Sequence, residues 1–247
     1  MLYPIGIQNF EDLRRSKYVY VDKTHHIHRL VSTGKYYFLS RPRRFGKSLL
    51  VSTMDAYFKG KKELFEGLAM EQLEKDWVEY PVLHIDLNIG RYLEQKDLDV
   101  ILHQHLNNWE DQYGISQKYD DFGARFSDVI DAVVSQTGRK VVILVDEYDK
   151  PIVNNLRKEP LVDYYRKTLQ GFYSVLKAKD GQIRFGFLTG VSKIGKMSVF
   201  SGLNNLTDIS VEPEYSDVCG ISEEDLHKYF DESVAELAEA NTLSIDE

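Results

Sequence analysis

Two apolar patterns alternate along the chain, and their alternation predicts its fold. Continuous apolar runs bounded by polar turns predict buried strands, and apolar residues three or four positions apart predict amphipathic helices. Strands are predicted at Tyr36–Ser40, Pro81–Leu87, Val141–Val145 and Ile183–Leu188. Helical spacing marks the segments between them, around residues 98–109, 124–135 and 161–176. This alternation predicts an α/β domain with a parallel sheet, right-handed crossovers and helices on both faces.

Both ends of the chain lie outside this alternation. Residues 1–34 are predicted to contain a helical turn at 10–15, an extended stretch at 18–21 and a helix at 22–32. Ser222 and Asp225 predict the start of a final helix, because a hydroxyl and an acid three residues apart form a helix cap. Its apolar stripe is too short for a core of its own and consists of Leu226, Tyr229, Phe230, Val234 and Leu237. We expect a core over residues 35–215, flanked by an N-terminal segment (1–34) and a C-terminal segment (216–247).

The first predicted strand runs into a basic turn and then a helix. A turn directly before a helix aims backbone N–H groups and the positive end of the helix dipole at one point, which suits a polyphosphate. Lys47 would reach the outer phosphates, Gly46 would allow close backbone approach, and the Ser48 hydroxyl would bind Mg²⁺. The predicted nucleotide-binding residues are Arg41, Pro42, Arg43, Arg44, Phe45, Gly46, Lys47, Ser48 and Leu49. Leu50, Met54, Tyr57 and Phe58 then recur at helical spacing and are expected to pack this helix onto the sheet.

One position departs from the usual phosphate-binding loop. That loop reads G-x-x-x-x-G-K-[ST], and its first glycine is replaced here by Arg41. Because Gly-Lys-Ser alone is a short pattern that arises by chance, the interpretation needs independent support.

The apolar run Val141–Val145 gives that support, because it ends in the acids Asp146 and Glu147. Open α/β sheets bind ligands at the carboxyl ends of their strands. Asp146 is predicted to hold Mg²⁺ through water, and Glu147 to polarise the water that attacks the γ-phosphate. The alternative is an ordinary buried strand that ends in a solvated acidic turn.

Other polar residues are candidates for a supporting role. Thr189, and after it Ser192, follow the last predicted strand and would contact the γ-phosphate or the attacking water, unless Thr189 and Gly190 merely form a turn. Weaker candidates for a charge-stabilising finger are Arg184 and Lys193. Asp22 and Lys23 are expected either beside the nucleotide or, for Asp22, in a helix cap. Residues 195–205 are expected to form a mobile loop or a partner surface.

Several segments together resemble one known family. They are Arg41–Ser48, Asp146–Pro151, Tyr3–Gly6 with Tyr20–Thr24, and Leu188–Lys193 through Ser201–Leu206. The sequence resembles the bacterial predicted AAA-ATPase-like proteins, relatives of the STAND-type P-loop ATPases, over nearly its whole length. The resemblance implies a P-loop NTPase fold, ATP and Mg²⁺ as ligands, a loop that begins with arginine, and the beginning of a helical lid at 216–247. Full-length members usually continue into a PD-(D/E)XK nuclease-like domain, through which alone nucleic acid would be bound.

Two functions remain open from the sequence. One is a Mg²⁺-dependent ATPase, in which Lys47, Glu147 and Thr189 are catalytic and Ser48 and Asp146 hold the metal. The other is a nucleotide-binding switch or scaffold with little or no hydrolysis, which Arg41 in the loop favours. Self-association or a protein partner fits either function.

Composition narrows the remaining classes of protein. With 43% apolar residues, the 247-residue chain can bury a sizeable core. It contains neither an apolar run long enough for a membrane span nor a signal segment, so a cytoplasmic protein without a membrane partner is expected. The lone Cys219 cannot form an internal disulfide.

Charge is distributed unevenly along the chain. The net charge is −8, but residues 207–247 hold 13 acids against Lys228 and so contribute −12, which leaves +4 for residues 1–206. The sharpest basic cluster, Arg41, Arg43, Arg44 and Lys47, favours a phosphate ligand over a general nucleic-acid surface.

Two further patterns are expected to have no catalytic or metal role. His25, His26 and His28 are close in sequence, but a solvated helix start explains them better than a metal site. Asp86, Glu94 and Lys96 have the letters of a nuclease motif. However, Glu94 and Lys96 are predicted at a helix start and not on the strand that such a site requires.

Overall fold

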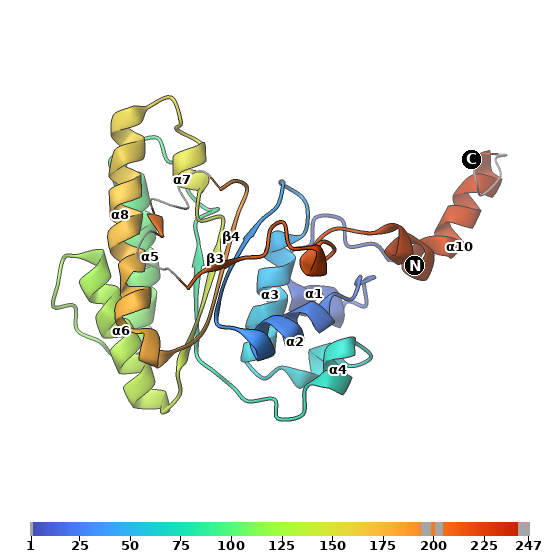
Figure 1. Cartoon of the computed structure of the whole chain (residues 1–247), viewed down its shortest axis with the longest axis horizontal. Coiled ribbons are helices and arrows are strands. Elements are labelled where there is room, and N and C mark those ends of the chain that lie inside the picture. The colour runs from blue at the N-terminus through green and yellow to red at the C-terminus, as the bar shows by residue number, and fades with distance from the viewer. Residues whose placement is uncertain (1, 194–198, 201–204, 242–247) are drawn as a thin grey trace.

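The computed structural model describes residues 2–193, 199–200 and 205–241 and shows a five-stranded parallel sheet with helices on both faces (Figure 1). The strands are β1 (Tyr36–Ser40), β2 (Val82–Asp86), β3 (Val141–Asp146), β4 (Ile183–Gly190) and β5 (Thr207–Asp208). Their order across the sheet is β2-β3-β4-β1-β5. The α/β fold with a parallel sheet, consistent with a P-loop NTPase, is therefore confirmed.

The sheet order places β4 between β1 and β3. Ser40 at the end of β1 is in register with Gly190, and Val145 near the end of β3 is in register with Leu188. Because all strands are parallel, the basic turn after β1, the acids at the end of β3 and Thr189 on β4 lie at one edge of the sheet. This arrangement requires the chain to cross from β1 to the far edge strand β2 and then to return.

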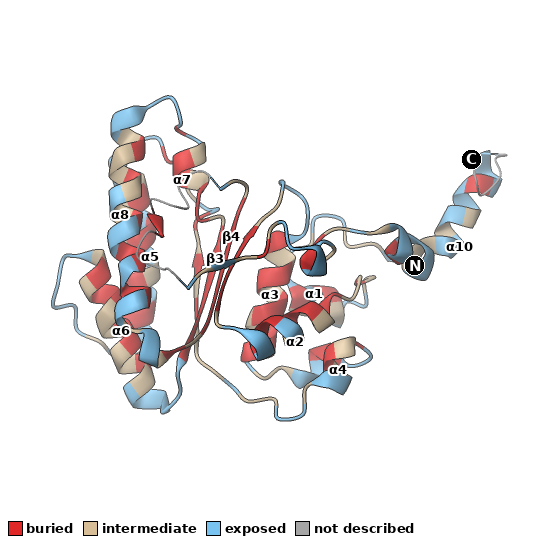
Figure 2. Cartoon of the chain, viewed as in Figure 1, coloured by how far each residue is buried: buried red, intermediate tan, exposed pale blue. Residues whose placement is uncertain are grey.

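Each face of the sheet carries its own group of helices. On one face lie α5 (Gln95–Gln112), α6 (Phe122–Thr137), α7 (Lys150–Val153) and α8 (Glu159–Ala178), and on the other lie α1 (Phe10–Arg15), α2 (Thr24–Thr33), α3 (Lys47–Phe58) and α4 (Ala69–Leu73). The sides of the helices that face the sheet are buried (Figure 2). Along β3, Ile143 and Val145 pack in the core formed with α5, α6 and α8, and Val142 and Leu144 pack in the core formed with α3. Alternation of side chains across a strand explains why this run is apolar at every position.

The predicted helix after the basic turn is α3, and it packs as expected. Leu50, Met54, Tyr57 and Phe58 all belong to the core shared with β3 and β4. The sequence did not predict the short strand β5, the helix α4 or the 3₁₀ turns η1 (Lys62–Phe65), η2 (Asp180–Gln182) and η3 (Pro213–Tyr215). These elements are too short to give a clear periodicity.

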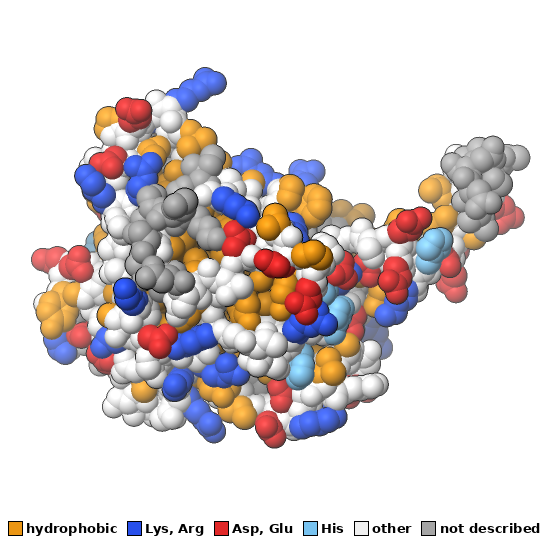
Figure 3. All heavy atoms as spheres, viewed as in Figure 1, with side chains coloured by type: hydrophobic (Ala, Val, Ile, Leu, Met, Phe, Trp, Pro, Cys, Tyr) orange, Lys and Arg blue, Asp and Glu red, His pale blue; other side chains and the backbone are white. Residues whose placement is uncertain are grey.

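The last helix, α10 (Glu223–Asn241), begins where the cap was predicted. Ser222 Oγ lies 2.7 Å from Asp225 Oδ2, and Asp225 N donates back to Ser222 Oγ at 3.1 Å. The helix projects from the body of the protein, and Leu226, Val234 and Leu237 of its apolar stripe are exposed (Figure 1). Figure 3 shows acidic side chains along this projection, whereas basic side chains on the face shown are scattered among other types.

Two further sequence-based expectations concern the 195–205 loop and the lack of a membrane span. Most of the predicted 195–205 loop, namely residues 195–198 and 201–204, lies outside the described residues. Within the part of the chain that is described, no helix combines the length and the apolarity that a membrane crossing requires.

Candidate functional site

The turn between β1 and α3 is held in a conformation that requires glycine at one position. Gly46, the residue that caps α3, has a φ of 87°, and its carbonyl accepts the first helical hydrogen bond from Leu50 N at 2.9 Å. A Cβ on Gly46 would meet nothing within 4 Å. Within the protein, the backbone conformation rather than lack of space therefore selects glycine here. Arg43, Arg44 and Phe45 in the same turn are exposed.

Lys47, the first residue of α3, is buried beneath this turn. Its ammonium donates to the carbonyl oxygens of Arg41 (3.0 Å) and Pro42 (3.2 Å). It also lies 3.1 Å from Oε1 of Glu147, which follows β3 directly. The basic turn and the acidic strand end, which the sequence analysis paired, thus meet through these two side chains.

One hydroxyl group on β4 contacts both acidic residues at the end of β3. Thr189 Oγ1 donates to Asp146 Oδ1 at 2.5 Å and accepts from Glu147 N at 3.3 Å. Thr189 is fully buried and Asp146 is 4% exposed. Glu147 adopts a left-handed backbone with φ 55°, a conformation that is rare outside glycine and is often found at functional sites. Burial raises the pKa of the Glu147 carboxyl, and the nearby Lys47 ammonium only partly offsets the rise.

A cavity of about 950 Å³ opens beside the turn and the start of α3. Its charged lining residues are Arg43, Arg44, Lys47, Lys150 and Glu147, so four cations face one carboxylate. Ser48 and Asn88 also line it, as does the N-terminal stretch 5–8. Asp146 and Thr189 do not belong to the described residues that line the cavity. The cavity is therefore wide, open to a polyanion and positively charged.

A second, smaller cavity of about 420 Å³ adjoins the first, since Ile5, Ile7, Arg44, Gly46 and Leu49 border both. Its remaining lining is mostly apolar and aromatic and comes from three distant parts of the chain: Tyr3 and Tyr20, Phe45 of the basic turn, and Val218, Ile221 and Phe230 near the C-terminus. A charged cavity beside an apolar one matches the two chemically different ends of a nucleotide.

Comparison with known proteins agrees with this geometry. The family described as predicted AAA-ATPase (AAA-ATPase_like) matches residues 4–200. The chain belongs to this family. It is also 44% identical over 229 residues to a protein of Azotobacter chroococcum mcd 1 described as an uncharacterized protein in the vnfD 5' region. The matched residues are 92% of this chain but 44% of that relative, so the chain spans less than half of the relative's length. No solved structure matches the chain.

In this predicted AAA-ATPase, the arginine that replaces the first loop glycine points to the C-terminal half of the chain. The Arg41 guanidinium donates to the carbonyl oxygens of Ser210 (2.5 Å) and Tyr215 (3.0 Å). Ser210 in turn accepts from Ser40 N at 2.8 Å. Arg41 does not belong to the described residues that line either cavity, and its side chain connects the loop to residues 210–216.

Thr189 does not belong to the described residues that line the charged cavity. It was predicted to touch the γ-phosphate or the attacking water, and in this structure its buried hydroxyl donates to Asp146 Oδ1. Ser192, the second candidate, lies in a loop held by Asp149: its backbone N–H (2.7 Å) and its hydroxyl (3.0 Å) both donate to that buried carboxylate.

The predicted finger residues lie elsewhere. Arg184 donates to Val31 O at 3.2 Å and its guanidinium lies over the ring of Tyr80. Lys193 pairs with Asp208 at 3.0 Å. Neither belongs to the described residues that line the charged cavity.

Asp22 and Lys23 connect elements of the fold and do not contact the charged cavity. Asp22 accepts from Thr24 N, the first residue of α2, at 2.8 Å and from Ala69 N at 2.7 Å, although the N-cap position of α2 is Lys23. Lys23 is buried and pairs with Asp225 (2.6 Å) and Asp217 (3.2 Å), although it also borders the apolar cavity. Of the two residues expected beside the nucleotide, Asp22 does not belong to the described residues that line either cavity, whereas Lys23 lines the apolar one.

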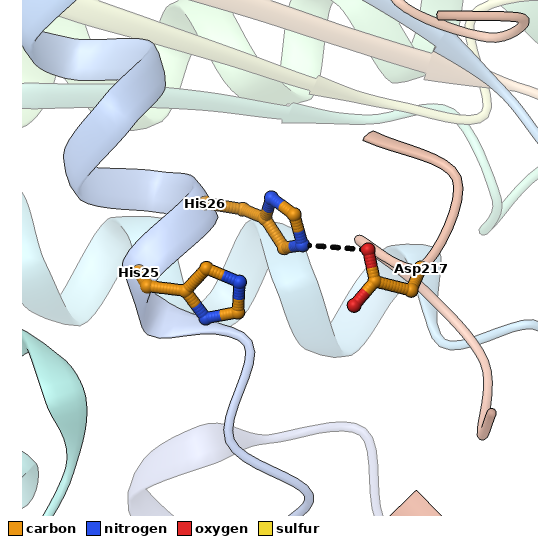
Figure 4. Close-up of side chains that lie close together, drawn as sticks. All are labelled: His25, His26 and Asp217. Carbon is orange, nitrogen blue, oxygen red and sulfur yellow. Dashed lines mark hydrogen bonds and ion pairs between the residues drawn. The ribbon is translucent and has the colours of Figure 1, made fainter. Parts of the chain in front are cut away.

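The structure corrects the prediction that the histidines at the start of α2 are solvated. His26 is buried, not solvated, and its Nε2 lies 2.9 Å from Asp217 Oδ1, with His25 beside it (Figure 4). The ligand atoms of these three residues are close enough to consider a metal ion. However, the Lys23 ammonium already binds the other oxygen of Asp217. The cluster is better described as a link between α2 and residue 217.

The sequence analysis missed several residues that the structure places at or near the site. Lys150, Asn88 and Asn154 line the charged cavity, and Asp149 fixes the loop after β4. Lys150 and Asp149 had a visible signal, because both lie within the Asp146–Pro151 string on which the family resemblance depends. Asn88 had none. The nuclease-like pattern fails as expected, since Glu94 caps α5 and Asp86 accepts from Asn88 N at 2.7 Å.

Proposed function

We propose that this predicted AAA-ATPase binds ATP with Mg²⁺ in the charged cavity and hydrolyses it to ADP and phosphate. One observation carries the proposal: Lys47 and Ser48, in the first turn of α3, line one cavity together with Glu147, whose carboxylate lies 3.1 Å from the Lys47 ammonium. A helix N-terminus, a lysine and an excess of cations suit a triphosphate, and a carboxylate within reach suits the activation of water.

The apolar cavity supports a purine base. Its aromatic residues Tyr3, Phe45 and Phe230 offer flat surfaces against which a purine ring packs well, and Tyr3 and Phe230 already stack with ring centroids 5.6 Å apart. Because Ile5, Arg44 and Leu49 border both cavities, one molecule can occupy both.

The donor set fits Mg²⁺, which prefers oxygen ligands and retains several waters. Ser48 offers a hydroxyl on the cavity wall, and Asp146 offers a carboxylate from behind it, suited to contact through water. When bound, the metal supplies charge neutralisation to the phosphates. Thr189 keeps Asp146 in place for this role.

In hydrolysis, Glu147 accepts a proton from water as the water oxygen bonds to the γ-phosphorus. The bond from that phosphorus to the bridging oxygen breaks, and ADP leaves with the electron pair. Lys47 binds the phosphates as a point charge. The raised pKa of Glu147 brings the carboxyl closer to the pH at which a general base is most effective.

A second candidate function is a nucleotide-dependent switch with slow hydrolysis. The observation that favours it is the Arg41 side chain, which connects the phosphate loop to residues 210–216 and so to the segment that leads into α10. A rearrangement of the loop on nucleotide binding would be transmitted along this connection. Both functions require nucleotide binding, and the rate of phosphate release separates them.

The properties of a whole protein are also proposals, because the curated relative is more than twice as long as this chain. We propose a cytoplasmic protein that passes its nucleotide state to a partner protein or to another copy. Nucleic acid would be bound only through a nuclease-like domain.

Thermal unfolding with Mg-ATP, Mg-ADP and Mg-GTP tests the proposal. Wild-type protein should be stabilised by about 2.7 kcal/mol when ATP is present at about one hundred times its dissociation constant. Lys47→Ala should abolish this stabilisation, and Lys167→Ala, an exposed lysine on α8, should retain it. No stabilisation of the wild type, or equal stabilisation of Lys47→Ala, would refute nucleotide binding at this site.

A further inference from the structure

One cation of the charged cavity, Lys150, belongs neither to the basic turn before α3 nor to the two acids at the end of β3. Lys150 lies at the start of α7, four residues after Asp146. It lines the cavity together with Lys47 and Glu147. The candidates for a charge-stabilising finger, Arg184 and Lys193, are engaged elsewhere, as described above.

The backbone fixes Lys150 relative to Glu147. Lys150 N donates to Glu147 O at 3.0 Å, which closes a turn whose first residue has the left-handed φ of 55°. The two residues are therefore the ends of one tight turn that leaves β3. The chain accepts a rare backbone conformation at Glu147, and the same turn brings a base and a cation to one cavity.

The ammonium of Lys150 is held by neutral oxygens. It donates to the carbonyl oxygen of Asn88 and, at 2.7 Å, to Asn88 Oδ1. Asn88 is itself fixed by the Asp86 carboxylate at the end of β2, through its backbone N–H. Across residues 2–193, 199–200 and 205–241, no carboxylate forms an ion pair with Lys150 within 4.0 Å. In contrast to Lys47, this cation is positioned without being neutralised.

We infer that Lys150 recognises the terminal phosphate of the bound nucleotide and so distinguishes ATP from ADP. A fixed, uncompensated ammonium gains most from a ligand that carries the additional charge of a γ-phosphate. Because Lys150 comes from the chain that carries Lys47 and Glu147, this cation belongs to the site itself and is not supplied by a second copy. This inference rests on the proposed nucleotide function.

The test compares affinities and does not depend on turnover. Mg-ATP and Mg-ADP are titrated into wild type, Lys150→Gln and Lys150→Arg by calorimetry, with Lys158→Gln, an exposed lysine before α8, as the matched control. Lys150→Gln should weaken ATP binding by about tenfold or more, as loss of a charged hydrogen bond does, and change ADP binding by less than about threefold. Lys150→Arg and Lys158→Gln should retain the preference for ATP. Lys150→Met, which keeps the aliphatic stem, replaces the glutamine variant if that variant does not fold.

The outcomes separate the two claims. If the wild type binds neither nucleotide, the proposed function fails and the role of Lys150 fails with it. If the wild type prefers ATP and Lys150→Gln shows the same ratio of affinities, the role of Lys150 alone is overturned. An equal loss of affinity for ATP and ADP would also overturn it, because Lys150 would then bind the inner phosphates.

Discussion

The ammonium of Lys47 lies 3.1 Å from Oε1 of Glu147, although one hundred residues separate them in the chain. Their side chains are 3% and 14% exposed, so each charge depends on the other for a partner, and the Lys47 ammonium depends also on the carbonyl oxygens of Arg41 and Pro42. In the proposed complex, phosphate oxygens compete with Glu147 for the ammonium. Nucleotide binding is therefore expected to release the carboxylate for its role toward water.

Glu147→Gln should separate binding from hydrolysis. Removing the base should slow phosphate release by about one hundredfold or more, the usual contribution of a general base. ATP should still bind, because the amide keeps the size of the side chain and removes a negative charge from the cavity. Steady-state phosphate release and ATP titration measure the two effects.

Glu236→Gln, which changes an exposed acid on α10, is the control and should behave as wild type. An unchanged rate in Glu147→Gln would exclude Glu147 as the base. A wild type that binds ATP but releases no phosphate above background would favour the switch.

Thr189→Val should weaken the hold on Asp146. The substitution keeps the shape of the side chain but leaves Asp146 Oδ1 and Glu147 N without a hydrogen-bond partner that they have now. We expect the free energy of unfolding to fall by about 1–3 kcal/mol and ATP binding to require more Mg²⁺. Denaturant unfolding and Mg²⁺ titrations at fixed ATP provide the measurements.

Thr189→Ser should restore most of both properties, since it returns the hydroxyl. Thr207→Val, the same change at an exposed position of β5, should affect neither. A normal Mg²⁺ requirement in Thr189→Val would argue against a positioning role.

Arg41→Met and Arg43→Met should affect different properties, stability in the first variant and ATP binding in the second. Arg41 donates to the carbonyls of Ser210 and Tyr215, so its loss should lower the free energy of unfolding by about 1.5–3 kcal/mol and change ATP affinity little. Arg43 is exposed and lines the charged cavity, so its loss should weaken ATP binding and leave stability nearly unchanged. Urea unfolding and ATP titration of both variants decide the matter. If Arg41→Met weakens ATP binding as much as Arg43→Met and leaves stability intact, the original expectation of direct nucleotide contact is correct.

The ion pairs of Lys23 with Asp225 and Asp217 should make the free energy of unfolding depend on pH in the acid range. Burial by itself would raise the pKa of Asp225, but the Lys23 ammonium and Ser222 lower it below its ordinary value, and the pKa of Asp217 is lowered as well. A carboxyl with a lowered folded-state pKa contributes stability above its unfolded pKa of about 3.9, and that stability is lost as the pH falls through the folded pKa. The wild type should therefore lose stability as the pH falls from about 5 to about 3.

Lys23→Met should show a shallower loss over that range. It should also be less stable at pH 7, by about 3 kcal/mol, because it leaves Asp225 buried without its cation. Urea unfolding at a series of pH values measures both effects. Lys96→Met, which breaks an exposed pair with Glu94, should retain the wild-type profile. The same steep acid dependence in Lys23→Met would contradict the assignment.

The local sequence determined most of the helices and strands, and it determined the basic turn that forms one part of the site. The apolar run at Val141–Val145 determined a strand buried on both faces, and the Gly46-Lys47-Ser48 turn determined a helix start suited to phosphate. Both follow from the chain itself, because periodicity reports which side of an element is buried and glycine reports where the backbone must be left-handed.

Only the tertiary structure decided which side chains meet. It placed β4 between β1 and β3, which set the Thr189 hydroxyl on Asp146 and left it out of the cavity. It directed Arg41 to Ser210 and Lys23 to Asp225, and it anchored Lys150 on Asn88. The physical reason is that such contacts depend on strand order and on the closure of long loops, whereas a sequence pattern records only the local balance of burial and exposure.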